Sequence, residues 1–96
     1  MYEVQKTDEF DGWLSALADQ RAVAKISSRI ERLGRGNSGD VEAVGEGVSE
    51  MRIHYGAGYR VYYKRTGNMI MMILCGGDKS TQADDIKRAK EIAAQL

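Results

Sequence analysis

The segment from residue 51 to residue 82 constrains the fold most, because two turn-like sequences divide it into three strand-like runs. The first turn is Gly56-Ala57-Gly58 and the second is Arg65-Thr66-Gly67-Asn68, and both contain residues that let paired antiparallel strands reverse. Residues 69–75, which follow the second turn, are apolar at every position. Such a run favours a central strand covered on both faces. We therefore predict three consecutive antiparallel strands.

The first two of these strands are basic. Residues 51–65 contain no Asp or Glu, and with histidine neutral they carry four positive charges in a chain whose net charge is zero. Neighbouring side chains point to opposite faces of a strand, so pairing the apolar residues of both strands over one core places the polar residues on the other face. We call that polar set the basic platform: Arg52, His54, Arg60, Tyr62 and Lys64.

Helical patterns and shorter strand-like runs surround this segment. Residues 2–6 alternate as a short first strand, and two amphipathic helices follow it, with Thr7 and Asp19 as their N-caps. Residues 41–44 form a further short strand, and Ser80 or Thr81 caps a last helix. We predict one α+β domain over residues 1–96, in which the N-terminal strand and the helical hairpin pack on an antiparallel sheet and a C-terminal helix follows.

Composition excludes several classes of protein. The chain has 96 residues, which is enough for one domain with one modest core. Cys75 is the only cysteine, so neither an internal disulfide nor a zinc site of several cysteines is expected. No apolar run is long enough to cross a bilayer, and the first residues do not resemble a secretory signal, so we expect a cytoplasmic protein. Gly76-Gly77-Asp78-Lys79 lacks the spacing of a Walker phosphate loop and is predicted to be the turn between the last strand and the last helix.

Several motifs occur in a specific order along the chain: FDGWL at residues 10–14, RIERL at 29–33, GNSGD at 36–40, VGEGVSEMRI at 44–53, GYRVYY at 58–63 and GGDKSTQ at 76–82. Together they resemble the phage-derived, HigB-like "addiction module killer" branch of the RelE/ParE toxin superfamily. The resemblance extends from about residue 10 to residue 92, and it implies a single domain with a RelE-like fold.

The resemblance also implies a function, namely the toxin of a type II toxin–antitoxin module. RelE-like toxins are endoribonucleases that enter the ribosome and cut mRNA without a metal or another cofactor. The implied partners are the ribosome with its mRNA and a cognate helix-turn-helix antitoxin. Operator DNA would be bound only through the toxin–antitoxin complex, and no membrane is involved. Because the ParE relatives poison DNA gyrase with the same fold, the fold alone does not decide the activity.

Cutting RNA through its own 2′-hydroxyl needs a base for the hydroxyl proton, cations for the phosphate and an acid for the leaving oxygen. Arg60 is the best phosphate clamp and Arg52 the second, because a guanidinium is always charged and binds phosphate through two parallel hydrogen bonds. Lys79 resembles the late basic residue of related toxins. His54 is the candidate base, because histidine changes charge near neutral pH. The late region, where some related toxins have their base, offers only Asp78 and Lys79.

The remaining candidates would bind the substrate: Tyr62, Lys64, Tyr59 and Asp78. An aromatic ring that stacks on an exposed base contributes roughly 1–3 kcal/mol in proteins that bind single strands. Strand parity favours Tyr62 for this role. Each charged candidate also has an ordinary structural interpretation, because Arg60 and Lys64 on a strand, or a lone His54, are commonly solvated surface residues.

Two further functions stay open beside the nuclease. The first is a ParE-like gyrase poison that acts by protein–protein binding, and the second is a decayed toxin that only binds its antitoxin. A gyrase poison has no need of a phosphate-binding cluster with a proton-transfer group, so Arg52, His54, Arg60 and Lys79 distinguish the nuclease from it. Acidic residues precede the basic segment, and this contrast in charge predicts that the antitoxin covers the basic platform or the neighbouring helical hairpin.

Overall fold

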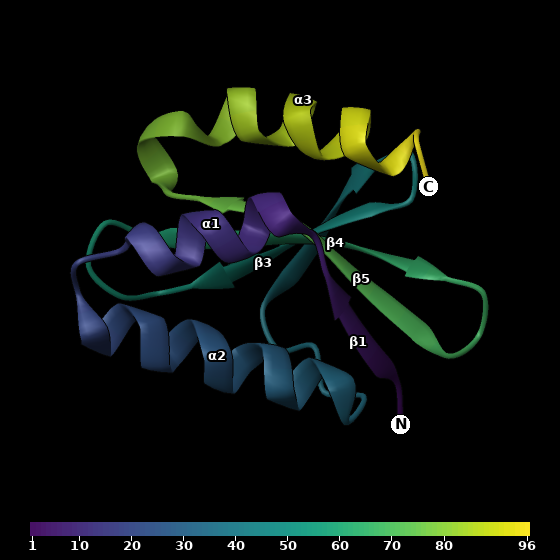
Figure 1. Cartoon of the computed structure of the whole chain (residues 1–96), viewed down its shortest axis with the longest axis horizontal. Coiled ribbons are helices and arrows are strands. Elements are labelled where there is room, and N and C mark those ends of the chain that lie inside the picture. Colours follow the sequence, from purple (N-terminus) through teal and green to yellow (C-terminus); the bar gives the residue numbers. More distant parts are fainter.

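The turns and the apolar alternation of the sequence produce a five-stranded mixed sheet with three α-helices, as the computed structural model of residues 1–96 shows (Figure 1). The elements along the chain are β1 (Glu3–Lys6), α1 (Asp8–Ala16), α2 (Gln20–Gly34), β2 (Val41–Gly45), β3 (Val48–Ile53), β4 (Tyr59–Thr66), β5 (Ile70–Gly77), the short 3-10 turn η1 (Lys79–Thr81) and α3 (Gln82–Ala93). The predicted α+β class is confirmed. None of the three helices has the length and the apolar composition needed to cross a membrane.

The sheet has the order β1-β5-β4-β3-β2. The pairs β2–β3, β3–β4 and β4–β5 are antiparallel, as predicted, whereas β1 runs parallel to β5. The prediction that the N-terminal strand packs on an antiparallel sheet is therefore wrong in one respect, because β1 joins the sheet as its edge strand and makes the sheet mixed. Alternating side chains look the same whichever way a strand runs, so the pattern of residues 2–6 contains no information on direction.

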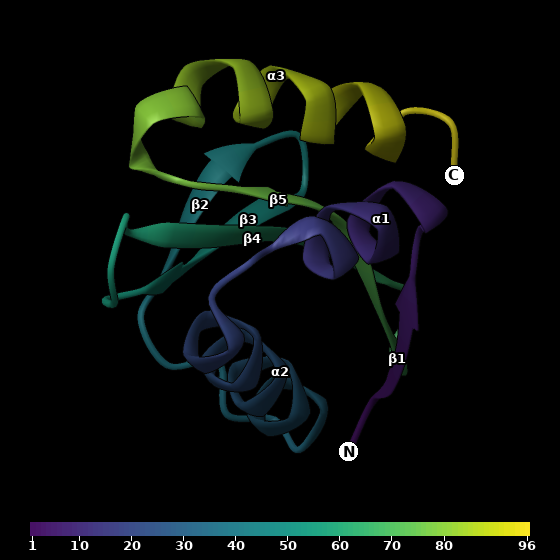
Figure 2. The same ribbon diagram turned by 60° about the vertical axis from the view of Figure 1, so that its left-hand side comes forward.

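Helices cover both faces of the sheet. Helices α1 and α2 lie on one face and α3 lies on the other (Figures 1 and 2). The larger core lies under α1 and α2, and it includes Met51, Ile53, Val61 and Tyr63 of the central strands. The smaller core lies under α3 and includes Leu74 and Cys75 of β5. The prediction that β5 is a central strand covered on both faces is confirmed.

Two of the predicted helix caps are present in the structure. The Thr7 hydroxyl accepts the N–H of Phe10, and the Asp19 carboxylate accepts the N–H groups of Arg21 and Ala22. Thr81 occupies the N-cap position of α3, but its hydroxyl makes no capping hydrogen bond and donates to Asp85 instead. These caps satisfy backbone donors that the first turn of a helix leaves unpaired.

The glycine pair of residues 76 and 77 lies inside β5, where Gly76 pairs with Val61 and Gly77 with Arg60. The prediction that these glycines form the turn after the strand is therefore wrong. A Cβ atom at Gly76 would overlap the indole of Trp13, and a Cβ atom at Gly77 would overlap the carboxylate of Asp85. Glycine is needed because α1 and α3 both approach the end of this strand closely.

Substitution Gly76→Ala is expected to lower the free energy of unfolding by about 1–3 kcal/mol, because the added methyl group overpacks the contact with the Trp13 ring. Urea unfolding of the two proteins measures the difference. Gly12→Ala is the matched control, because Gly12 lies in α1 with no atom within 4 Å of its Cβ position. Alanine is the better helix former, so the control should be stabilised by about 0.5–1 kcal/mol. An unchanged stability of Gly76→Ala would show that α1 does not pack on β5 as described.

Candidate functional site

The pairing of β3 with β4 places the two predicted phosphate clamps side by side, with Arg52 directly opposite Arg60. Their neighbours on the same face are Glu50 and Tyr62, which also form a cross-strand pair. The apolar residues Met51 and Val61 point to the opposite face, into the core under α1 and α2. The predicted alternation is confirmed for Arg52, Arg60, Tyr62 and Lys64, which share the face that α3 partly covers. It is not confirmed for His54, which follows the end of β3 and lies beside α2.

A small cavity of about 130 Å³ opens beside the two arginines. Its lining consists of residues from the end of β3, the β3–β4 turn, the start of β4 and the start of η1: Arg52, Ile53, His54, Gly58, Tyr59, Arg60 and Lys79. All four candidate catalytic residues are among them. Together they bring three cations and one imidazole to a single hollow.

Gly58 places two of these residues. Its φ is +75°, a conformation that a side chain disfavours, and a Cβ atom there would lie 3.4 Å from Cβ of Lys79. The Gly58 carbonyl accepts a hydrogen bond of 3.1 Å from Nη1 of Arg60. The β3–β4 turn therefore contacts Lys79 on one side and orients the Arg60 guanidinium on the other.

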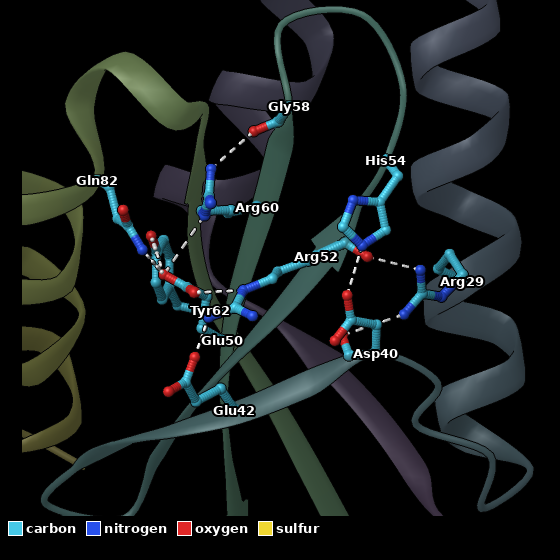
Figure 3. Close-up of polar contacts among 10 residues, drawn as sticks. All are labelled: Arg29, Asp40, Glu42, Glu50, Arg52, His54, Gly58, Arg60, Tyr62 and Gln82. Atoms are coloured by element: carbon cyan, nitrogen blue, oxygen red, sulfur yellow. Dashed lines mark hydrogen bonds and ion pairs between the residues drawn. The ribbon is translucent and has the colours of Figure 1, made fainter.

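The carboxylate of Glu50 is completely buried and contacts the guanidinium groups of both Arg52 and Arg60 (Figure 3). Its Oε1 accepts a hydrogen bond of 3.1 Å from Nε of Arg52, and its Oε2 lies 3.6 Å from Nε of Arg60. Oε2 also accepts hydrogen bonds from the Tyr62 hydroxyl at 3.0 Å and from the Gln82 amide at 2.9 Å. Burial and the neighbouring Glu50 carboxylate raise the pKa of the Tyr62 hydroxyl, so this group stays a proton donor.

The contacts of the cations show which charge is free for a ligand. Arg52 forms ion pairs with two carboxylates, Glu50 and Glu42, whereas Arg60 forms an ion pair with Glu50 alone. Lys79 has no ion pair and no side-chain hydrogen bond, and its side chain is exposed. Glu50 faces both arginines through Nε, Glu42 contacts Nη2 of Arg52, and the Gly58 carbonyl accepts from Nη1 of Arg60. The other Nη group of each arginine has no hydrogen-bond partner in the protein. An anion in the cavity would therefore meet Lys79 and the outer donors of Arg60.

His54 lies immediately after β3, and its side chain is 75% exposed. Its Nε2 contacts the Asp40 carboxylate, and this hydrogen bond lowers the pKa of Asp40. A histidine held by a carboxylate is the arrangement that orients a general base in many enzymes. The structure thus provides His54 with a partner and places it at the edge of the cavity (Figure 3).

Three of the predicted substrate-binding residues lie elsewhere. The stacking role of Tyr62 is wrong, because the ring is fully buried between the sheet and α3 and has no face free for a base. Lys64 pairs with Val48 at the far end of β4, where its side chain packs beside Gly47. Asp78 accepts hydrogen bonds from the backbone and the hydroxyl of Ser80, which lower its pKa and make it a cap of η1.

Tyr59 is the predicted aromatic residue that does line the cavity, and the edge of its ring packs against Trp13 with 6.3 Å between the ring centroids. Three residues of the site were not identified from the sequence: Glu50, Gln82 and Asp40. For Glu50 a signal was present, because it lies two residues before Arg52 and therefore shares its face of the strand.

Comparison with known proteins identifies one family. The chain is 51% identical over 94 residues to an uncharacterized protein of Haemophilus influenzae, and the match covers 98% of this chain and 95% of that protein. The chain belongs to the same family as this protein. No family model matches the chain, and no solved structure matches it.

Proposed function

We propose that this chain, and with it the family that includes the Haemophilus influenzae protein, belongs to the HigB-like branch of the RelE/ParE superfamily and has a RelE-like fold. Its function is that of a type II toxin, a ribosome-dependent endoribonuclease that cuts mRNA and stops translation. The ordered motifs of the sequence support the assignment, and so does the mixed sheet between a helical hairpin and a C-terminal helix.

The observation that carries this proposal is the convergence of four residues on one small cavity: Arg52, His54, Arg60 and Lys79. They come from separate places in the chain, and a buried carboxylate keeps the two arginines in position. Solvated charges on a strand would need neither a common hollow nor a buried partner. A cluster of cations beside an oriented imidazole suits a substrate that is an anion and reacts by proton transfer.

The chemistry follows from these positions. The 2′-oxygen of a ribose attacks the adjacent phosphorus, and the bond from phosphorus to the 5′-oxygen breaks. The proton of the 2′-hydroxyl passes to Nδ1 of His54, because Nε2 already contacts the Asp40 carboxylate. Arg60 and Lys79 bind the phosphate oxygens, on which negative charge increases in the transition state. The leaving 5′-oxygen takes a proton from Lys79 or from water. The products are a 2′,3′-cyclic phosphate and a 5′-hydroxyl end.

The partners follow from the resemblance together with the site. The mRNA enters the cavity on the ribosome, and a helix-turn-helix antitoxin blocks the cavity in the resting cell. The antitoxin covers the surface around Arg60 and Lys79 or the adjoining hairpin of α1 and α2. Operator DNA is bound only by the complex of the two proteins.

Induced expression in a bacterial host distinguishes this function from the alternatives. We expect growth arrest, new 5′ ends within translated codons and normal supercoiling of a reporter plasmid. Arrest with intact transcripts and altered supercoiling would instead support a gyrase poison. Growth without arrest would indicate a decayed toxin that only binds its antitoxin. Mapping of transcript ends and a plasmid topoisomer gel from the same cultures measure all three outcomes.

A further inference from the structure

A second hollow adjoins the cavity. It is a groove of about 400 Å³ between α2 and the end of β3, lined by Ala24, Lys25, Ser28, Arg29, Arg32, Ile53 and His54. Ile53 and His54 line both hollows, so His54 lies on the ridge between them. Figure 3 shows the same arrangement, with His54 and Asp40 between the paired arginines and helix α2.

Arg29 connects the wall of this groove to the cavity. Its Nη1 donates a hydrogen bond of 2.7 Å to the backbone carbonyl of Arg52, and its Nη2 donates to the carbonyls of Ser38 and Asp40 at 3.2 and 3.4 Å. Because these hydrogen bonds join α2 to β3 and to the loop between α2 and β2, Arg29 fixes the groove at a constant position beside the cavity. Arg29 itself therefore has mainly a structural role.

The other two cations of the groove are free to bind a ligand. Lys25 and Arg32 are both exposed, and neither forms an ion pair. Lys25 Nζ lies over the Tyr55 ring, 5.4 Å from its centroid, and this cation–π contact uses none of the hydrogen-bond donors of the ammonium. Asp40 is the carboxylate nearest to the ridge, and it already contacts His54. The wall of the groove formed by α2 is therefore positively charged, with Lys25, Arg29 and Arg32 spaced about one turn apart along the helix.

The charges around the cavity favour a polyanion that runs from the cavity into the groove along α2. A nucleic-acid strand that left the cavity towards β2 would meet the carboxylate of Glu42, which contacts Arg52. One that passed Lys79 would meet the carboxylate of Asp78. Only the side facing α2 continues with unpaired cations. A nucleic-acid strand whose reacting phosphate occupies the cavity would therefore extend over His54 into the groove, where its next phosphates meet Lys25 and Arg32.

We propose that the groove between α2 and β3 is a binding site for single-stranded RNA, which holds the phosphates next to the one that occupies the cavity. This inference rests on the proposed function, because it assigns to the groove the flanking part of the same substrate strand. The ligand is the sugar–phosphate backbone, so binding in the groove is independent of base sequence and depends strongly on salt.

The test uses the purified chain and a fluorescent oligouridylate of twelve nucleotides, with binding followed by anisotropy over a series of salt concentrations. The double variant Lys25→Ala/Arg32→Ala should bind more weakly. The slope of log affinity against log salt concentration should become shallower by about 1.4, because each lost phosphate contact on a single strand contributes about 0.7. The charge-matched control Lys6→Ala/Lys87→Ala removes two exposed lysines outside both hollows and should keep the wild-type slope.

A dinucleotide is the second ligand, because it can fill the cavity without reaching far into the groove. Wild type and the groove variant should bind it equally. The inference is overturned if the two double variants give the same slope, or if the wild-type chain does not bind the oligouridylate at low salt. It is also overturned if the groove variant binds RNA normally but no longer binds its antitoxin, since the groove is then a protein interface. Transcript mapping tests the proposed function independently, because oligouridylate binding does not require cleavage.

Discussion

Arg60→Ala is expected to lower the rate of mRNA cleavage by about 10²–10³-fold, which is the usual effect of removing one preorganised donor to a developing negative charge. Arg60 lies at the wall of the cavity, its Nη1 is fixed by the Gly58 carbonyl, and its Nε faces the buried Glu50. These contacts orient the guanidinium before any substrate binds. The rate is measured by primer extension on an mRNA in a translation mixture reconstituted from purified components.

The control for this variant is Arg65→Ala. Arg65 is on the same strand, but its side chain is exposed and contacts the Asn68 carbonyl and the Tyr2 ring, away from the cavity. It should retain the wild-type rate. The conservative variant Arg60→Lys keeps the charge but loses the paired donors. Its cleavage rate should therefore lie between the rates of Arg60→Ala and Arg65→Ala. Thermal unfolding of each variant shows whether a lost rate reflects the site or the fold. Equal rates for Arg60→Ala and Arg65→Ala would exclude Arg60 from the reaction.

Glu50→Ala is expected to lower the free energy of unfolding by about 3 kcal/mol, because it removes the carboxylate partner of the largely buried Arg60 guanidinium and one of the two partners of Arg52. Glu50 is completely buried, and Arg60 beside it exposes only 12% of its side chain. The substitution also removes the acceptor of the Tyr62 hydroxyl and of the Gln82 amide. Urea unfolding at neutral pH measures the loss.

Two variants show whether burial causes this effect. Glu42→Ala removes a carboxylate that also contacts Arg52 but is 58% exposed, and it should cost about 0.2–1 kcal/mol. Tyr62→Phe keeps the ring and removes one hydrogen bond to a charged group, so a cost of about 1.5–3 kcal/mol is expected. If Glu50→Ala cost no more than Glu42→Ala, the network around Glu50 would not be an important source of stability.

The sequence predicts the faces of β3 and β4 well because apolar and polar residues alternate around Met51–Ile53 and Arg60–Val61. Met51 and Val61 point to one core, so the pattern alone places Arg52 and Arg60 together on the other face. The turn glycines and the N-cap residues Thr7 and Asp19 are local signals of the same kind. Such signals depend on neighbours in the chain, which is why they can be interpreted without a structure.

What the sequence does not predict depends on contacts between distant segments. Parity puts Tyr62 on the correct face, but only the packing of α3 shows that the ring is buried there. Gly77 looks like a turn residue until Asp85 is seen against it. Glu50 reads as one acidic residue among several, and its role appears only where two arginines, Tyr62 and Gln82 meet it.

If the cavity beside Arg60 cuts translated mRNA, the cuts must appear when the purified chain meets translating ribosomes. Purified wild-type chain is added to a reconstituted translation mixture, and the mRNA ends are mapped with and without active ribosomes, with Arg60→Ala in parallel. We expect cuts within codons that need translating ribosomes, leave 2′,3′-cyclic phosphate ends and are nearly absent in the variant. Intact mRNA with the wild-type chain, or equal cutting by Arg60→Ala, would contradict cleavage at this cavity.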